Sequence, residues 1–516
     1  MHMKHSLFIL AVMSLLFLGS CASDDSLSEL TPEPKPETPT IPFTGTISFG
    51  DNPSAVIQAA MADPSPKFEA LSDEEVKVAA TWEVGDELAL VIDGTVTKAT
   101  VSEVKDGKAY ISARVVSTVS DGADARFIYP YTAVDQNTGQ VKENLLAEQD
   151  GKLETIAKQF DVCEGSGKLS VYGGAAVVQE DITMLEKFSI MRFETRLAND
   201  NSPLNVRRMQ IEQGDDTYHI NLPSPAYQSI YVILKPFTAM PLDVWGLPDP
   251  DGVAYKKSAP NATLLARKFY RSTLKMTIDD MWFPYKNTFY MWDAKKWVWD
   301  GVDPYITEFG DKDETNYPTA ETPDRYYNTS GITDDPGTAA GRSDAQYSAK
   351  DMPCLNAMGW YMKHGDAYVD FQTVYRLNGQ KLTGGVWLKK WNKISEKPAG
   401  ATITSCSSQH PDLQYNGTIG GVRYGETLIR NSGAPNNSDD YFFLPAIGDY
   451  NTDSERINEG MGFYWSSSIK SDAYSHCFWY DIKRSNSPSY LYIFTTTPKK
   501  FSCIGGHRPD GSAWFK

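Results

Sequence analysis

The sequence has few histidines and cysteines, and none of them stands at the spacing of a common catalytic or metal-binding motif. There are 7 histidines and 6 cysteines in 516 residues. No HExxH or CxxC pair, no GxSxG turn and no Walker loop is present. Zinc peptidases, zinc ribbons, thiol redox proteins, serine hydrolases and P-loop enzymes carry these motifs, so those classes are excluded. We predict that the chain is not an enzyme; paired carboxylates for glycoside hydrolysis, whose geometry is three-dimensional, stay open.

Positive charge is also in short supply. Lysine and arginine together number 49 against 66 aspartates and glutamates, which gives a formal net charge of −17 at pH 7. A surface of that sign repels phosphates, so we exclude nucleic acid as a partner. The acidity favours solubility instead.

Long apolar runs are almost absent, and the single one lies at the N-terminus. Residues 7–18 are apolar apart from Ser14, a run shorter than the roughly 20 residues that a membrane-spanning helix needs. The run follows Lys4 and ends in LGSC at residues 18–21. This is the arrangement of a secretory signal peptide, with small residues at its cleavage site.

The LGSC segment resembles the lipobox of bacterial lipoproteins. That resemblance implies a signal peptide over residues 1–20 and a lipid on Cys21, and the alternative is an ordinary signal peptide with a chance cysteine. Several acyl chains on one residue give stable anchoring where a single chain is marginal. We therefore expect the protein on the outer membrane, at the cell surface of a Gram-negative bacterium.

Proline is concentrated directly after this cysteine. Residues 21–40 form a linker, and four prolines fall among threonines and glutamates at Pro32, Pro34, Pro36 and Pro39. Proline at this density favours an extended and semi-rigid spacer. The spacer would hold a globular body away from the membrane.

From about residue 41 the pattern is that of β-strands. Short runs rich in valine, isoleucine, tyrosine, phenylalanine and threonine alternate with turn residues. One of them, Ser189 to Glu194, alternates apolar and polar residues, as a strand with one buried face does. Many such strands at regular spacing predict β-sandwiches, so we expect a mostly β protein.

Composition changes sharply after Met276. Ten of the 12 tryptophans follow this residue, which indicates a separate domain with its own core. Between Tyr305 and Lys350 the chain is polar and too long for a plain connection, and its role stays open.

The first half resembles the fimbrillin family of lipoprotein pilus subunits. The matching segments are TWEVGDEL at 81–88, FIYPY at 127–131, FSIMRF at 188–193 and LARKFY at 265–270. The resemblance implies two transthyretin-like β-sandwiches in tandem, over residues 41–166 and 167–277. It also implies contact with other pilus subunits by donor-strand exchange.

The sequence departs from this family in one respect. In pilus-forming members a protease that cuts after arginine removes the first strand, and here no arginine precedes Arg114. Either another enzyme cuts the chain, or the protein stays anchored and never polymerises.

The second half resembles a C-type-lectin-like domain carried by some of these surface proteins. The matching segments are YMWDA at 290–294, GGVWLKK at 384–390, FLPA at 443–446 and GFYWSS at 462–467. The resemblance implies an α+β domain over residues 278–516 in a tip or accessory subunit. Its partner would be a protein or a glycan on a host or bacterial surface.

Four aromatic residues are candidates for sugar stacking. Tyr464 and Trp465 lie in the segment GMGFYWSSS, and Trp297 and Trp299 are spaced to share one face of a strand. Exposed rings would bind the apolar face of a sugar, whereas buried rings would be part of the core. The structural interpretation is favoured for both pairs.

The sequence offers two further, weaker candidate sites. Asp439 and Asp440 follow two asparagines and a serine, and the oxygens of this segment make it the first choice for a calcium site. A solvated turn without metal is the favoured interpretation, and we predict no cofactor. Cys477 and Cys503 lie in strand-like runs and could form a disulfide in an exported protein.

These observations lead to one leading hypothesis, a fimbrillin-like adhesin anchored to the cell surface. The alternative is a surface lipoprotein that captures nutrient glycans without forming fibres.

Overall fold

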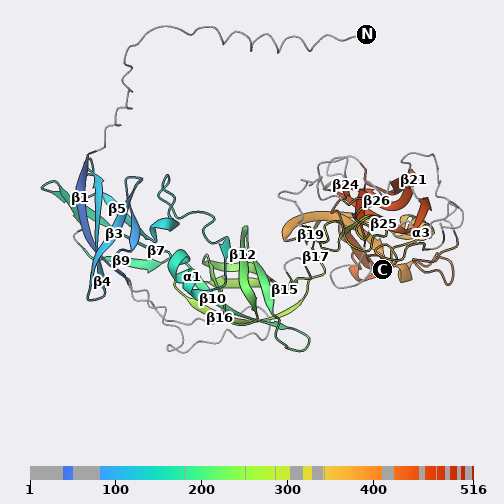
Figure 1. Cartoon of the computed structure of the whole chain (residues 1–516), viewed down its shortest axis with the longest axis horizontal. Coiled ribbons are helices and arrows are strands. Elements are labelled where there is room, and N and C mark those ends of the chain that lie inside the picture. Colours follow the sequence, from blue (N-terminus) through green and yellow to red (C-terminus); the bar gives the residue numbers. More distant parts are fainter. Residues whose placement is uncertain are drawn as a thin grey trace, which may run out of the picture.

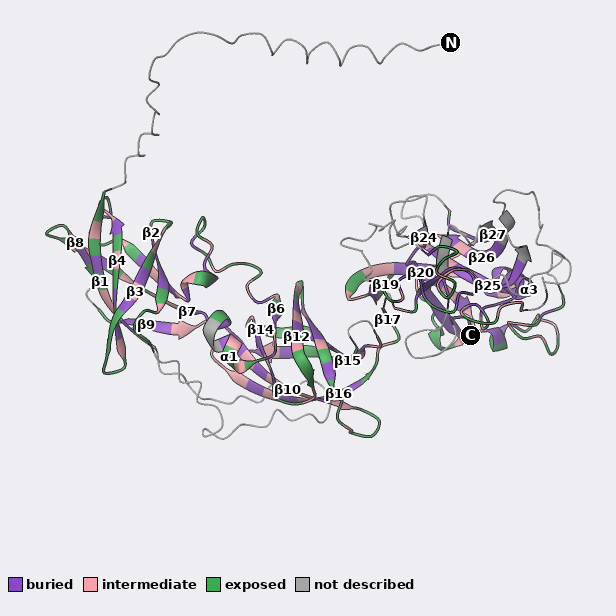
Figure 2. Ribbon diagram, in the orientation of Figure 1, coloured by how far each residue is buried: buried purple, intermediate pink, exposed green. Residues whose placement is uncertain are grey.

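The computed structural model describes residues 39–49, 82–178, 180–249, 252–284, 286–302, 318–327, 341, 343–408, 423–451, 460–471, 474–482, 488–496, 501–505 and 514–516. The predicted signal peptide, Cys21 and nearly all of the proline-rich linker lie outside these residues. The protein is mostly β, as the strand pattern predicted, and Figure 1 shows three bodies that follow one another along the chain. In each of them the buried residues gather inside, as Figure 2 shows. No helix in the described ranges is long and apolar enough to cross a membrane.

The first body is a ring of β-strands closed by β1, the first strand in the part of the chain that the structure describes. Its sheet runs in the order β4-β3-β2-β5-β7-β8-β1-β9, and β1 also pairs with β4. Phe43 and Ile47 of β1 point into the core, where they meet the apolar residues of the other strands. The strands are β1 (Thr40–Phe49), β2 (Glu87–Ile92), β3 (Thr95–Lys105), β4 (Lys108–Val116), β5 (Asp124–Tyr129), β7 (Cys163–Tyr172), β8 (Ala175–Val178) and β9 (Ile182–Glu186).

The boundary between the two sandwiches was predicted too early. We expected the first sandwich to end at residue 166, but β7, β8 and β9 pair with β5 and β1, so the first sheet extends to Glu186. The strand character of these segments is visible in the sequence. Their pairing partners are not, because pairing is set by contacts between residues far apart in the chain.

The second body is one eight-stranded sheet in the order β13-β10-β16-β15-β14-β11-β12-β6. Its core includes Met191, Ile211 and Tyr270, and it extends to Ile156 and Phe160 in the segment that links β5 to β7 of the first body. The strands are β6 (Glu148–Gln149), β10 (Ser189–Leu197), β11 (Val206–Gln213), β12 (Asp216–Ala226), β13 (Ile230–Leu234), β14 (Phe237–Leu247), β15 (Tyr255–Leu264) and β16 (Phe269–Ile278), and the segment between β5 and β7 also holds η1 (Tyr131–Ala133), α1 (Leu153–Thr155) and η2 (Ile156–Phe160).

The third body, called the C-terminal module below, combines two sheets with one helix. One sheet has the order β17-β19-β20-β23 with β22 beside β19, and the other has the order β18-β28-β25-β26-β27-β21 with β24 beside β28. Its strands are β17 (Trp282–Phe283), β18 (Phe289–Tyr290), β19 (Tyr368–Leu377), β20 (Gln380–Lys389), β21 (Arg423–Leu428), β22 (Asn431–Ser432), β23 (Tyr441–Pro445), β24 (Tyr450–Asn451), β25 (Met461–Ser471), β26 (Tyr474–Asp481), β27 (Tyr490–Thr496) and β28 (Phe501–Ile504).

The helix α3 (Leu355–His364) is buried on almost every side. It packs against strands of both sheets, and its residues 355–362 are all buried. Cys354 precedes the first turn, and Lys363 lies in the last turn, where its positive charge is favourable at a helix C-terminus. Together with the tryptophan-rich core this gives the α+β body that the second resemblance implied.

Candidate functional site

The segment GMGFYWSSS is part of the core and not an open platform. It forms most of β25, in which Tyr464 and Trp465 are both 0% exposed. The Trp465 indole donates to the carbonyl oxygen of Tyr290 at 2.6 Å, and the Tyr464 hydroxyl donates to that of Pro445 at 2.8 Å. Since the polar atom of each ring already has a protein partner and no face is open, neither ring is placed to stack on a sugar.

The serines of the same segment hold the start of α3. The Ser466 hydroxyl donates to the carbonyl oxygen of Pro353 at 3.0 Å, and the Ser468 hydroxyl oxygen accepts from the amide of Leu355 at 3.2 Å. The first amides of a helix have no partner within the helix, so a buried side-chain acceptor satisfies one of them. The motif therefore joins a strand to a helix.

The second aromatic pair is also inside. Trp297 and Trp299 are 8% and 1% exposed and meet edge to face, with ring centroids 5.7 Å apart. Trp297 lies in an irregular segment and Trp299 in a turn, so neither is on a strand and the predicted shared strand face is wrong. The Trp299 ring also meets Phe289 of β18, which places the pair in the main core of the module.

Lysines surround the candidate calcium turn. Asp439 and Asp440 end the short helix η5 (Ser438–Asp440), and the Asp440 carboxylate lies 2.7 Å from Lys393 Nζ. Lys390 Nζ donates to the carbonyl oxygen of Asp439 at 2.6 Å. Hydrogen bonds from Lys393 and Asn437 lower the pKa of Asp440. In the described part of the chain no group of three or more histidine, cysteine, aspartate or glutamate side chains could hold a metal ion.

The predicted disulfide between Cys477 and Cys503 disagrees with the topology. Cys477 lies on β26 and Cys503 on β28, and these strands flank β25 on opposite sides. Two strand spacings amount to about 10 Å, beyond the roughly 7 Å over which two Cα atoms can be bridged. Cys477 is buried on β26.

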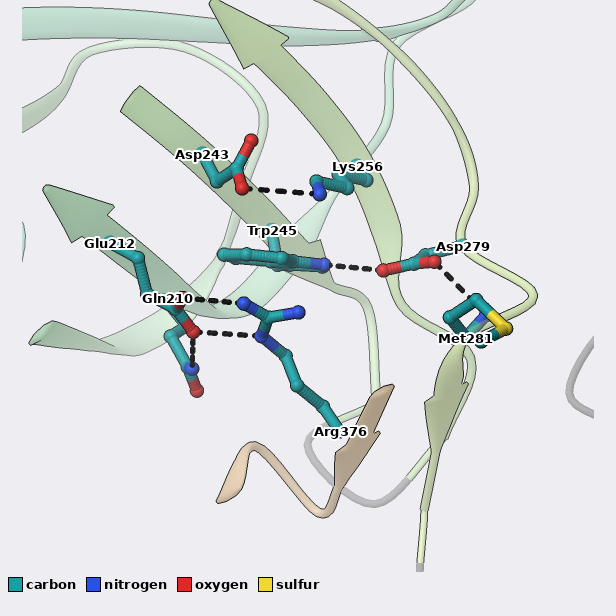
Figure 3. Close-up of polar contacts among 8 residues, drawn as sticks. All are labelled: Gln210, Glu212, Asp243, Trp245, Lys256, Asp279, Met281 and Arg376. Atoms are coloured by element: carbon teal, nitrogen blue, oxygen red, sulfur yellow. Dashed lines mark hydrogen bonds and ion pairs between the residues drawn. The ribbon is translucent and has the colours of Figure 1, made fainter. Parts of the chain in front are cut away.

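A cluster of buried polar side chains joins the second body to the C-terminal module, and nothing in the sequence pattern predicted it. Arg376 of β19 donates from Nε to Oε1 of Glu212 on β11 at 2.7 Å, and its Nη2 meets the other carboxylate oxygen. The Arg376 guanidinium carbon lies 4.0 Å from the centre of the Trp245 ring. Figure 3 shows Arg376 on one face of that ring and Lys256 on the other.

The segment that connects these two bodies, which includes Asp279 and Met281, forms hydrogen bonds with both of them. Asp279 accepts from the Trp245 indole at 2.6 Å and from the amide of Met281 at 3.0 Å (Figure 3). The Met281 carbonyl oxygen accepts from the amide of Arg376 at 2.8 Å. Trp282, which follows, packs on Trp245 with ring centroids 5.9 Å apart. The passage between the bodies is therefore a packed joint and not a free linker.

A glycine of the C-terminal module, Gly379, lies in close contact with the second body at this joint. Gly379, in the turn between β19 and β20, accepts from Nε2 of Gln210 at 3.0 Å through its carbonyl oxygen. Its φ is +94°, and a Cβ there would lie 2.6 Å from Oε1 of Gln210. Any other residue would be strained in its backbone, and its Cβ would force the end of the Gln210 side chain to shift.

Beside the joint lies a polar cleft of about 520 Å³. Both bodies line it, with Arg208, Thr217 and His219 from the second body and Asn378, Gln380 and Lys381 from the C-terminal module. Arg208 Nη2 lies 3.3 Å from Nδ1 of His219, and burial together with this guanidinium lowers the pKa of His219. The imidazole is accordingly neutral at pH 7, and the cleft presents hydrogen-bonding groups of mixed charge.

The first strand occupies a slot with a partner on each edge. β1 pairs antiparallel with β4 from Thr40 to Ser48, and it pairs parallel with β8 at Phe43 and with β9 at Ile47. Arg114 of β4 donates from Nε to the Thr40 hydroxyl at 2.9 Å. The arginine discussed above thus lies inside the sheet that β1 completes.

Comparison with known proteins gave matches to solved structures only. No family model matches the chain. No curated protein matches it either. A Bacteroides uniformis protein assigned to cell adhesion is 12% identical, over 48% of this chain and 97% of its own, with a TM-score of 0.26.

Two further solved structures carry fimbrial names. A fimbrial assembly protein from Parabacteroides distasonis is 8% identical, over 46% of this chain and 99% of its own, with a TM-score of 0.24. A fimbrial protein from Bacteroides ovatus is 9% identical, over 80% of this chain and 94% of its own, with a TM-score of 0.19. All three are weak matches in both sequence and shape.

Proposed function

We propose that this protein is a cell-surface adhesin of the fimbrillin type, placed in a pilus as a tip or accessory subunit. The observation that supports it best is the place of β1. This strand closes the first ring by pairing with β4 on one edge and with β8 and β9 on the other. A strand held in this way can be supplied by a second chain while the rest of the sheet stays the same.

In this proposal other pilus subunits contact the chain by donor-strand exchange at the β1 slot. Phe43 and Ile47 fill the slot from inside, at 1% and 0% exposure, so an incoming strand needs apolar residues at the same alternation. Cleavage after Arg114 would cut within β4 and remove β2 and β3 together with β1, so that arginine is not the place where β1 is released.

The remaining parts of the proposal concern location and ligand. The lipid on Cys21 would hold the protein at the outer membrane, and the C-terminal module would meet a protein or glycan on a host or bacterial surface. Since Trp297, Trp299, Tyr464 and Trp465 are buried, that contact falls to exposed loops or to the polar cleft at the joint. The adhesion and fimbrial names of the similar solved structures agree with this proposal.

The test uses the mature chain with residues 39–49 deleted and a synthetic peptide of those residues. We expect the peptide to bind the deleted chain and to restore its thermal stability. A peptide with Phe43→Asp and Ile47→Asp is the matched control and should not bind. If the deleted chain folds and ignores both peptides, the slot is not an exchange site. Electron microscopy of the intact chain mixed with the deleted chain then shows whether fibres form.

Glycan capture without fibres, the other candidate, has less support. The four rings that would form its platforms are inside the core.

A further inference from the structure

Two cysteines that are 52 positions apart in the sequence meet at the start of α3. The amide of Cys354 donates to the carbonyl oxygen of Ile403 at 2.7 Å. The side-chain amide of Asn356 donates to the carbonyl oxygen of Cys406 at 2.9 Å. Both the backbone amide and the thiol of Cys406 affect the pKa of the Cys354 thiol, as expected for neighbouring residues. The turn at residues 402–406 therefore packs against the first turn of α3.

Both thiols are enclosed. Cys354 and Cys406 are each 0% exposed, and both are free in the structure. The Cys406 amide donates to the carbonyl oxygen of Gly341 at 2.9 Å, which fixes the backbone of this turn from the other side. The two other described thiols lie elsewhere, Cys163 in the first body and Cys477 in the sheet that contains β26. The fold thus brings together one pair that the sequence did not single out.

We propose that Cys354 and Cys406 form a disulfide when the protein is exported, and that this bond ties the start of α3 to the turn at residues 402–406. The proposal rests on the surface location given above, because disulfides persist in oxidising compartments. Two S–H bonds break and one S–S bond forms. The two electrons reduce the disulfide of a thiol oxidoreductase, or a small disulfide such as oxidised glutathione, to two thiols, which take up the two protons.

The burial of the two thiols indicates when the disulfide forms relative to folding. Only a thiolate attacks a disulfide, and burial raises the pKa of the Cys354 thiol to about 11. The folded module therefore reacts slowly, and the bond forms while the turn and the helix are still accessible. Once the module has closed, the same burial protects the disulfide from reductants.

The proposed disulfide would limit how far the C-terminal module can be extended when an anchored protein is pulled. The chain between Cys354 and Cys406 includes α3, β19 and β20, and therefore Arg376, which holds the joint to the second body. A pull on an anchored adhesin cannot extend a segment that is closed by a covalent bond. The disulfide would thus preserve the element that docks the C-terminal module.

The experiment uses the full mature chain secreted to an oxidising compartment, and in parallel the same chain refolded with oxidised glutathione. Free thiols are alkylated in denaturant without reductant, and tryptic peptides are measured by mass spectrometry. We expect peptides 351–363 and 394–423 to appear linked, two hydrogens lighter than their sum, and to separate after reduction. Cys354→Ser and Cys406→Ser should each abolish the link, and Cys477→Ser, a buried thiol without this neighbour, should leave it intact.

A second readout does not depend on how the variants fold. In the wild-type chain the link should resist dithiothreitol under native conditions and yield to it in denaturant. Full alkylation of both thiols in the secreted and in the refolded chain would overturn the proposal, as would linkage to Cys477. Because this assay contains no ligand and no second subunit, a negative result leaves the proposed adhesion function untouched, and a failure of adhesion leaves the disulfide untouched.

Discussion

Arg376 and Glu212, which lie 164 positions apart in the sequence, form a two-point ion pair across the joint between the second body and the C-terminal module. Only 7% of the arginine side chain and 11% of the glutamate side chain are exposed. A charge buried to that extent is tolerated when it is paired and hydrogen-bonded, and the Trp245 ring covers the guanidinium. The position of the C-terminal module is therefore set by specific chemistry.

Removing one partner of this pair should loosen the joint. We expect Arg376→Ala or Glu212→Ala alone to cost about 3–5 kcal/mol, because each leaves a buried charge without its partner. The double variant should cost less than the sum of the two, with a coupling of about 0.5–3 kcal/mol. Denaturant unfolding measures both values. The exposed pair Lys98–Glu87 is the control, with a coupling of at most about 1 kcal/mol, and equal couplings at the two pairs would contradict a buried joint.

Trp465→Ala should destabilise the C-terminal module by about 3–5 kcal/mol, because it empties a fully buried site and removes the bond to the Tyr290 carbonyl. Trp465→Phe should cost less, since most of the volume stays. Thermal unfolding followed by tryptophan fluorescence measures the change. An alanine variant of native stability that loses glycan binding would show that the ring is a ligand platform after all.

Asp161 gives the protein a pH dependence with a definite sign. Burial and the nearby Glu186 raise its pKa to about 7, from an ordinary value of 3.8. Between about pH 4 and pH 7 the folded state keeps a proton that the unfolded state has lost, so the unfolding free energy falls as pH rises and levels off above pH 7. The loss amounts to at most about 4 kcal/mol.

Asp161→Asn removes this titration. Subtracting the unfolding free energies of the variant from those of the wild type at each pH isolates the contribution, because the other carboxyl groups titrate in both proteins. The difference should change between pH 4 and pH 7 and stay constant above. A difference that is flat over the whole range would mean that Asp161 is not protonated in the folded state.

The turn at Asp439 and Asp440 should not respond to calcium. Lys393 and Lys390 already neutralise it, so adding Ca²⁺ or a chelator should leave the melting temperature of the wild-type chain unchanged. The chain with Lys390→Ala and Lys393→Ala supplies the contrast, since the Asp440 carboxylate then lacks both positive neighbours. A rise in the wild-type melting temperature with calcium, lost in Asp440→Asn, would show a metal site.

The pattern of residues was enough to indicate the class of fold. Alternation such as that of Ser189 to Glu194 predicts a strand with one buried face, and β10 has such a face, which includes Met191 and Phe193. At its start the order is reversed, because polar Ser189 is buried and apolar Ile190 is only half-buried. The favoured interpretation of Tyr464 and Trp465 as core residues agrees with their burial in the structure. By local rules the two glycines of GMGFYWSSS favour a buried turn, whereas the segment forms most of strand β25.

What the sequence could not supply is the set of partners across long separations. Nothing near Arg376 in the chain indicates Glu212, and nothing near Cys354 indicates Cys406, so the sequence led to Cys477 and Cys503 instead. The boundary at Glu186 was missed for the same reason. Local sequence determines whether a segment is a strand and which of its faces is apolar, because these depend on neighbours one or two residues away. Pairing, joints and cysteine contacts were decided only by the tertiary structure, because they depend on which distant faces bury each other.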